Sequence, residues 1–275
     1  MLIRAMTPDD MSLVLGWAAV EGWNPGAGDG RYLLATDPQG FFVAEDAGEV
    51  VGSIAMPRFG PGYAFCGMYI VRPDHRGGAV GMRLARAASD YAEGRIVGTD
   101  GVLENVRAYE RLGFEAAHSH HRHSGIPTPA ETDHIRPGGT VDIEVLLAID
   151  DACFAGERRD FMRAWLGAPH IVRASVDADG VPDGFGVARE ATDGWRIGPL
   201  YAPDAGRASE IMRSLAAALP GVMLHVDVNT ANGEAAVMAR DLEMAPGFEC
   251  VRMYRGGVPD LPAQRIFAVC TLEAG

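Results

Sequence analysis

The residues best suited to chemistry form a strand, a glycine-rich loop and the start of a helix. The apolar run Met68–Val71 predicts a buried strand, and Pro73-Asp74 predicts a turn after it. The segment Gly77–Gly81 contains three glycines, which let a ligand approach the backbone because no Cβ stands in the way. The first N–H groups of a helix lack intrahelical partners and carry the positive end of its dipole. The stretch therefore predicts a site for a pyrophosphate.

Two common pyrophosphate motifs do not match this loop. A P-loop needs Gly-x-x-x-x-Gly-Lys-Ser/Thr, and the chain contains no lysine. The dinucleotide pattern Gly-x-Gly-x-x-Gly after a first strand is also missing. The loop must serve another class of ligand.

A second segment with chemical potential is Asn105-Val-Arg-Ala-Tyr-Glu-Arg-Leu-Gly-Phe114. It predicts a short helix that ends at Gly113 in the left-handed conformation. A phenol of pKa ~10, such as that of Tyr109, stays protonated at neutral pH and can donate a proton, although a lone tyrosine can equally serve packing. Asn105 can bind a ligand or cap its own helix.

Together the two segments resemble the signatures of the GNAT acyltransferases. Arg76–Gly81 resembles the acetyl-CoA loop Arg/Gln-x-x-Gly-x-Gly/Ala, with Ala79 in place of the middle glycine, and Asn105–Phe114 resembles the second signature. The resemblance covers roughly the first 125 residues. It implies an α+β fold with an α/β-type mixed sheet, here in two tandem copies.

The resemblance also implies roles for individual residues. Acetyl-CoA would be the co-substrate, a strand N–H would hold its thioester carbonyl, and Tyr109 would protonate the departing sulfur. The implied cofactor-binding set is Met68, Tyr69, Ile70, Val71, Arg76, Gly77, Gly78, Ala79, Val80, Gly81, Met82 and Asn105.

The acceptor site is expected in the polar, turn-rich stretch that follows the first helix. Glu21 and Asp29 are candidates to take a proton from the acceptor, directly or through water, and each can equally be a solvated carboxylate. Trp23 and Asn24 are candidate walls of the site, because an indole in a polar loop needs a partner. A structural Trp23 that covers the helix end is the alternative.

Composition limits the partners. The net charge of −13 argues against nucleic acid and anionic membranes, which require clustered basic residues, and it suits a cationic amine. No apolar run reaches membrane-spanning length, and the start of the chain does not resemble a signal peptide. The four cysteines have no short spacing and are expected to be reduced, which favours a cytoplasmic protein; a homo-oligomer stays open.

The histidines between residues 118 and 123 invite a metal interpretation. On a strand, His118 and His120 face one side while His121 and His123 face the other, so at most two converge. No cysteine or acid stands at ligand spacing. We therefore expect no metal site, and a histidine-bearing strand near the active site or a domain interface instead.

The predicted elements fall into two halves. Thr7-Pro8 predicts a helix start with Leu13, Val14, Trp17 and Ala18 on its buried side, and Asp46-Ala47-Gly48 predicts a hairpin. The predicted domains are a catalytic domain at 1–126, a Pro/Gly-rich linker at 127–140 and a degenerate domain at 141–275.

A weak internal repeat supports this division. Four landmark pairs recur at offsets of 127 to 134 residues. They are Gly52 and Gly184, Gly67 and Gly198, Asn105 and Asn232, and Phe114 and Phe248. The second loop, Asp204-Ala-Gly206-Arg, has one glycine and an acid where a phosphate would meet repulsion.

The sequence thus predicts an acetyl-CoA-dependent N-acetyltransferase that acts on a primary amine of a small acceptor by direct attack. The alternative is a non-catalytic acyl-CoA-binding or sensor protein. A third hypothesis is a structural protein of two tandem domains, in which the second half serves oligomerisation.

Overall fold

The structure is a computed structural model that describes all 275 residues and shows the same order of elements twice. The first half contains β1 (Leu2–Ala5), α1 (Pro8–Val20), α2 (Asp29–Thr36), β2 (Phe41–Asp46), β3 (Glu49–Ala55), β4 (Arg58–Phe59), β5 (Tyr63–Val71), α3 (Val80–Ala92), β6 (Ile96–Val102), α4 (Val106–Arg111) and β7 (Glu115–Gly125). The second half contains β8 (Ile135–Pro137), α5 (Ile143–Cys153), α6 (Arg159–Trp165), β9 (Ile171–Val176), β10 (Pro182–Glu190), β11 (Trp195–Tyr201), α7 (Ala205–Ala218), β12 (Leu224–Asn229), α8 (Ala235–Asp241), β13 (Ala245–Arg255) and β14 (Ile266–Ala268).

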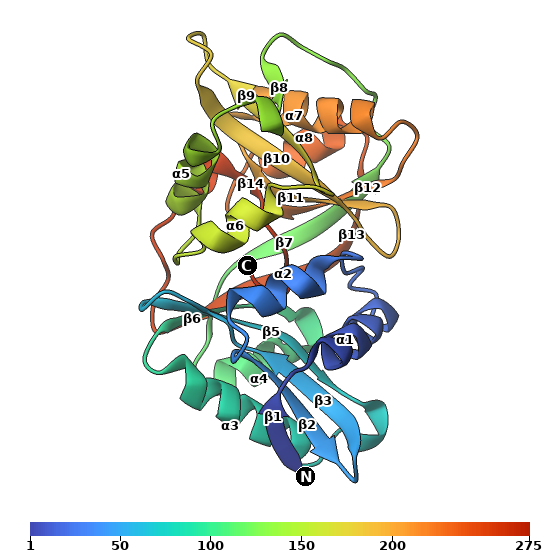
Figure 1. The fold of residues 1–275 in the computed structure, drawn as a ribbon, viewed down its shortest axis with the longest axis vertical. Coiled ribbons are helices and arrows are strands. Elements are labelled where there is room, and N and C mark those ends of the chain that lie inside the picture. The colour runs from blue at the N-terminus through green and yellow to red at the C-terminus, as the bar shows by residue number, and fades with distance from the viewer.

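One mixed sheet runs through both halves (Figure 1). Its order is β1-β2-β3-β5-β6-β13-β7-β12-β14-β11-β10-β9-β8, with β4 beside β5. The pairs β5–β6 and β11–β12 are parallel, and the others are antiparallel. The predicted α+β fold with a mixed sheet in two tandem copies is therefore confirmed.

The last long strand of each half lies in the sheet of the other half. β13 pairs with β6, and β7 pairs with β12, while β7 and β13 pair with each other in the middle of the sheet. In Figure 1 the two strands cross the centre of the molecule side by side. The division into residues 1–126 and 141–275 thus describes the repeat along the chain, whereas the sheets share strands.

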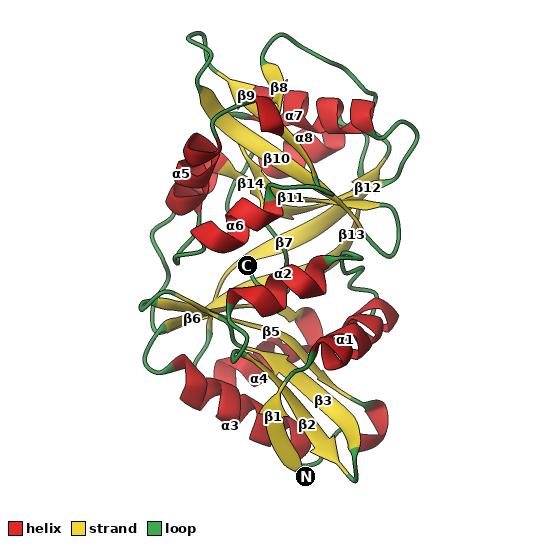
Figure 2. Cartoon of the chain, in the orientation of Figure 1, coloured by secondary structure: helices red, strands yellow, loops and turns green.

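Three apolar clusters form the core. The largest, of 28 residues, is shared by the halves, because it unites side chains of α1 and α2 with side chains of α5 and α6. Separate clusters lie beneath α3 in the first half and beneath α7 and α8 in the second. Figure 2 shows α2 and α6 adjacent at the middle of the molecule and α7 and α8 at its far end. The halves are joined by a core as well as by a sheet.

The start of α1 forms as predicted, with one error on its buried side. Thr7 and Asp10 form a capping box with Pro8 in the first turn. Leu13 is exposed, because the side that packs inward carries Met11 and Val14. Helix α2, which begins at Asp29, was not predicted from the sequence.

The predicted linker at 127–140 contains structure. Ile135–Pro137 form β8, which pairs with β9 at the edge of the sheet. This strand corresponds to β1 of the first half, so a linker running to residue 140 was too long. The proline and glycines that suggested a linker lie at the end of a short edge strand, where a missing N–H donor is tolerated.

The structure also corrects the repeat at its last landmarks. After α4 the Phe114 N–H donates to the Tyr109 carbonyl at 3.1 Å, and after α8 the Met244 N–H donates to the Ala239 carbonyl at 3.0 Å. Phe114 therefore corresponds to Met244 and not to Phe248, which lies within β13. Asn232 likewise precedes α8 by three residues, whereas Asn105 directly precedes α4. It follows that Ala239 stands where the first half has Tyr109.

Candidate active site

The site begins where β5 and β6 separate. The parallel pairing of the two strands ends at Cys66 and Thr99, and β5 then bulges at Met68, whose φ is +47°. The Ser53 hydroxyl holds this bulge by donating to the Met68 carbonyl at 2.8 Å. Over Met68–Val71 the side of β5 that faces β6 consequently has no strand partner, which leaves its amides free for a ligand.

The glycine-rich loop after β5 has the conformation that an anion site needs. Gly77 has a φ of +78°, which favours glycine, whereas Ala79 has a φ of −80° and accommodates its side chain. No side chain caps the first turn of α3. Gly78 and Ala79 are exposed, so the free N–H groups of α3 open to solvent.

The Arg76 side chain lies across the entrance to this loop. Its guanidinium donates to the Val71 carbonyl at 2.8 Å and to the Glu21 carboxylate at 2.6 Å. About half of the Arg76 side chain remains exposed. A phosphate arriving at the loop would therefore compete with Glu21 for this guanidinium.

An open groove leads from the loop to a small enclosed pocket. The groove is lined by Glu21, Trp23, Tyr69, Ile70, Val71, Arg76, Val102, Leu103, Glu104, Asn105, Ala108, Tyr109, Leu112, Gly247, Phe248 and Glu249. The pocket, of about 40 Å³, is lined by Trp23, Cys66, Gly67, Met68, Tyr69, Thr99, Asp100, Val102, Asn105, Tyr109, Phe248, Cys250, Leu272 and Glu273. Trp23, Tyr69 and Tyr109 line both, so the two spaces are continuous.

Tyr109 lies where groove and pocket meet. Its ring packs edge-on against Phe114 at 5.6 Å between centroids and lies against Gly101, where a Cβ would approach the ring to 3.0 Å. Burial is the main cause that raises the pKa of Tyr109 well above its ordinary value, and the nearby Cys66 adds to it. The phenol thus keeps its proton at neutral pH.

The structure separates the other candidate residues into two groups. Asn105 lines the groove and the pocket, and its side chain makes no capping hydrogen bond to α4. Trp23 lines both spaces, and Glu21 lines the groove.

Asn24 and Asp29 lie elsewhere, contrary to expectation. The Asn24 amide bonds the backbone of Asp193 at 2.9 and 2.8 Å, which ties this loop to the β10–β11 turn. Asp29 is fully buried and accepts from the Arg189 guanidinium at 3.1 Å. Both residues join the halves of the chain and do not face the pocket.

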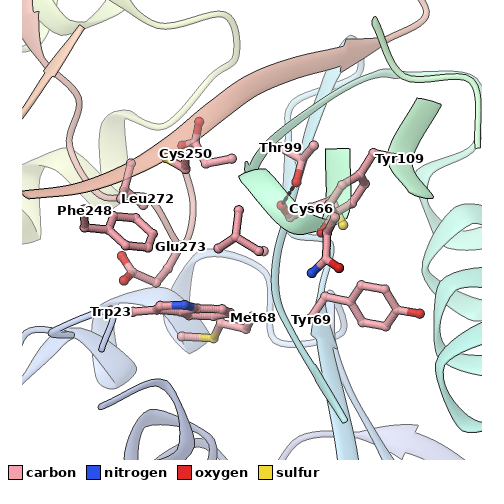
Figure 3. A pocket seen from close by; sticks show the side chains of 14 residues that line it. Trp23, Cys66, Met68, Tyr69, Thr99, Tyr109, Phe248, Cys250, Leu272 and Glu273 are labelled. Carbon is pink, nitrogen blue, oxygen red and sulfur yellow. Dashed lines mark hydrogen bonds between the residues drawn. The ribbon is translucent and has the colours of Figure 1, made fainter. Parts of the chain in front are cut away.

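The second half supplies pocket residues that no sequence motif indicated. Phe248 and Cys250 come from the exchanged strand β13, and Leu272 and Glu273 come from the segment after β14. In Figure 3, Trp23, Phe248 and Glu273 lie on one side of the space, and Tyr69 and Tyr109 lie on the other. The sequence signal for Phe248 was present as a Gly-Phe-Glu repeat, but it was assigned to the wrong place in the fold.

A buried network of charges holds this side of the pocket. Asp227 accepts from the Arg122 guanidinium at 2.8 and 3.1 Å and from Arg196, and both arginines keep the pKa of Asp227 far below its ordinary value despite its burial. Arg122 also donates to the Trp23 carbonyl at 2.8 Å, and Arg196 donates to the Glu273 carboxylate at 3.1 Å. The network thus positions the loop that carries Trp23.

The corresponding site of the second half is filled. β14 lies between β11 and β12, at the place where those strands separate, and pairs with both. The first turn of α7 is capped by the Asp204 carboxylate, which accepts from the Arg207 N–H at 2.9 Å. With Ala239 in place of the tyrosine, the second copy has neither an open strand edge nor a proton donor.

The histidines of β7 are distributed as predicted along the strand. The His118 and His120 rings contact each other at 5.1 Å, whereas His121 reaches Glu249 at 3.0 Å. No three His, Cys, Asp or Glu side chains of the chain come close enough to hold a metal ion. None of the helices has the length and apolar character to cross a membrane.

Comparisons with known proteins agree with this geometry. Family models described as "Acetyltransferase (GNAT) domain" match residues 37–116 and 146–268. Holothin acyltransferase of Pseudoalteromonas sp. (strain SANK 73390) is 27% identical over 271 residues, which cover 97% of this chain and 92% of that protein. Uncharacterized N-acetyltransferase YitH of Bacillus subtilis (strain 168) is 26% identical over 208 residues, or 74% of this chain and 73% of the relative.

Solved structures show the same fold at low identity. A putative acetyltransferase from Pyrococcus horikoshii has a TM-score of 0.85 at 17% identity, with 100% of this chain and 95% of that chain covered. A tandem GNAT protein from the clavulanic acid biosynthesis pathway has a TM-score of 0.64 at 15% identity, with coverage of 94% and 99%. With both halves matched, the chain belongs to the GNAT acetyltransferase family and carries two GNAT domains in tandem.

Proposed function

We propose that the chain is an acetyl-CoA-dependent N-acetyltransferase that acetylates a primary amine of a small acceptor in its first half. The observation that carries this proposal is one continuous path. It runs from the uncapped α3 loop, along the open edge of β5, to the half-buried phenol of Tyr109.

Each part of the path suits one step of the transfer. The loop amides and Arg76 would hold the pyrophosphate, and a free amide of Met68–Val71 would donate to the thioester oxygen as it becomes negative. Tyr109 would protonate the departing thiolate. Direct attack fits a groove that opens next to the pocket, because the acceptor and the thioester can then be present together.

The size of the pocket favours a short acyl group. A volume of about 40 Å³ has room for about three water molecules, since one water needs ~10–15 Å³ of such space. An acetyl group has three heavy atoms and suits this space, whereas a long acyl chain would have to displace Leu272 or Met68. The fact that a relative spanning nearly the whole chain is named holothin acyltransferase also places holothin among the acceptors to test.

The test is acetyl-CoA consumption over a library of amines, together with CoA binding by calorimetry. Gly78→Glu should abolish CoA binding, because its carboxylate would lie at the anion site. The variant should still fold, because no atom comes nearer than 3.7 Å to a Cβ at that position. Gly206→Glu, at the corresponding loop of the second half, is the matched control and should bind CoA normally. Normal CoA affinity in Gly78→Glu would overturn the loop assignment, and CoA binding without transfer to any amine would favour a sensor.

A further inference from the structure

We propose that Glu273, carried by the segment after β14, binds the acceptor amine in the first half and takes its proton. This inference rests on the proposed N-acetyl transfer and names a residue that the GNAT motifs of the chain do not contain. It also gives the second half a part in the chemistry.

The path of the chain brings Glu273 to the site. β14 fills the space between β11 and β12, and the following residues cross to the first half, where Leu272 and Glu273 line the pocket. The backbone of Glu273 lies so close to Gly67 that a Cβ there would overlap the Glu273 carbonyl. Gly198 of β11 has the same relation to the Cys270 carbonyl. The two glycines let one segment pass against both central strands.

The Glu273 side chain is built into a fixed position. Only 3% of the residue is exposed, and its carboxylate accepts from the Arg196 guanidinium at 3.1 Å and from the Thr271 hydroxyl. Arg122 and Arg196 balance Asp227 and Glu273, so the network is electrically neutral. Each carboxylate oxygen can accept more than one hydrogen bond, which leaves capacity for an amine N–H in the pocket.

The other carboxylates near the site are also paired with arginines, so its position in the pocket, and not a lack of partners, distinguishes Glu273. Asp100 is the second acid that lines the pocket, and both its oxygens accept from the Arg252 guanidinium at 2.7 Å. Glu21 pairs with Arg76 in the open groove, and Asp29 is buried against Arg189. Among these acids, Glu273 lies beside Trp23 on the side of the pocket opposite Tyr109 (Figure 3).

The proposed step balances as follows. The nitrogen lone pair of a neutral amine attacks the thioester carbonyl carbon, the C–N bond forms, and the C–S bond breaks with its electron pair on sulfur. One N–H proton passes to the Glu273 carboxylate, and the Tyr109 phenol gives its proton to the thiolate. Proton exchange with solvent then returns both side chains to their starting forms.

Several titratable or charged groups line the pocket with Glu273 or belong to the ion pairs around it. They are Arg196, Asp227, Arg122, Asp29, Asp100, Arg252, Cys66, Cys250, Tyr69 and Tyr109. Burial raises the pKa of Cys66 to about 12, which keeps this thiol protonated and uncharged in the pocket. Because so many groups lie near Glu273, the test should change its charge and leave its size unchanged.

The experiment compares Glu273→Gln in the full chain with the parent, using an amine that the parent acetylates. We expect kcat at pH 7 to fall by roughly 10²–10³-fold, with KM for acetyl-CoA within about twofold. The deficit should shrink towards pH 9, where solvent hydroxide can take the proton. Glu273→Asp should recover part of the activity, and Glu234→Gln, an exposed acid at the start of α8, is the surface control.

The role of Glu273 and the proposed N-acetyl transfer can fail separately in this experiment. An equal loss of kcat at every pH, or full activity in Glu273→Gln, would overturn the role of Glu273 and leave N-acetyl transfer standing. If the parent transfers acetyl to no amine although it binds acetyl-CoA, both proposals fail. An unchanged melting temperature and CoA affinity in Glu273→Gln would show that its loss of activity does not reflect unfolding.

Discussion

The surroundings of Tyr109 favour the protonated form of its phenol. Because burial and a neighbouring thiol raise its pKa above the ordinary value near 10, it stays protonated across the working range of an amine acetylation. Tyr109→Phe should lower kcat by about 10²-fold and leave KM for acetyl-CoA unchanged. In the parent, the pH–rate profile should show no loss of activity from this group below pH 10. A fall of the parental rate between pH 8 and pH 9 would contradict the assignment.

The Glu21–Arg76 ion pair should weaken the binding of CoA, because it engages the same guanidinium. Both side chains are more than a third exposed, so the pair contributes less than about 1 kcal/mol, and CoA phosphate must displace it. Glu21→Gln should therefore tighten CoA binding by about two- to fivefold in calorimetry. The gain should vanish in the Arg76→Ala background. A weaker affinity in Glu21→Gln would show that the pair supports the loop.

Site residues could be predicted from the sequence where they belong to one short continuous motif. Arg76, Gly77 and Tyr109 were found because their neighbours in sequence are their neighbours in space. Glu273 lies about 200 residues from Met68 and reaches the pocket only through the path of β14. Asp29 was assigned to a polar loop because its partner, Arg189, comes from the other half.

Helix α1 shows how one element positions the loop that carries Trp23. The Asp10 carboxylate accepts from the Thr7 N–H at 2.8 Å and from Arg4 at 2.5 and 3.1 Å, and the Arg4 bonds are the main cause that lowers the pKa of Asp10 to about 2. Trp23 then follows the end of this helix, where its N–H donates to the Ala18 carbonyl at 3.0 Å. The start of α1 is thus fixed on the sheet, and its end fixes the loop.

Asp10→Asn should destabilise the fold at neutral pH. A carboxyl whose pKa is lower in the folded state stabilises the fold above its unfolded value of 3.8, and the contribution is lost as the pH falls towards 2. We expect a loss of about 1–2 kcal/mol at pH 7 in urea unfolding, shrinking to about a third of that at pH 2.5, where the folded carboxyl is still partly ionised. An equal difference at both pH values would attribute the effect to packing.

Strands β7 and β13 show what sequence could not reveal about elements. Their patterns of exposure agree at ten of eleven positions, with only the tenth half-buried in β7 and buried in β13. Either strand therefore presents nearly the same burial pattern to either sheet. A burial pattern shared by two strands does not tell which sheet either of them joins, so the strand exchange could not be predicted from the sequence.

At the scale of the molecule, the shared core and the exchanged strands make the halves one cooperative unit. Arg252 of β13 and Asp100 of β6 form a buried ion pair across this junction. The whole chain should unfold in a single calorimetric transition, with equal calorimetric and van't Hoff enthalpies. Two separate transitions would show that the halves are independent. Arg252→Met removes the guanidinium that pairs with the buried Asp100. It should lower the free energy of unfolding by about 3–5 kcal/mol while the unfolding remains a single transition.

His120 links this junction to pH. Burial lowers its pKa to about 4 in the folded chain, whereas the unfolded value is near 6.5, so the unfolded chain binds more protons between these values. This group should therefore remove about 2 kcal/mol of stability between pH 7 and pH 5. Urea unfolding of His120→Gln should show a correspondingly smaller change over this range. An identical change in the variant and the parent would exclude His120 as the cause.

The strand exchange also bears on how such a protein evolves. A duplicated domain that folds alone can be lost, or moved to another gene, without harm to its twin. Here, deletion of the second copy would remove β13 from beside β6 and Glu273 from the pocket. Natural selection can thus tolerate the loss of glycines from the second loop. It still acts against the loss of the strands around that loop. The second copy is then no relic, because the first copy depends on it for a strand beside β6 and for a wall of its pocket.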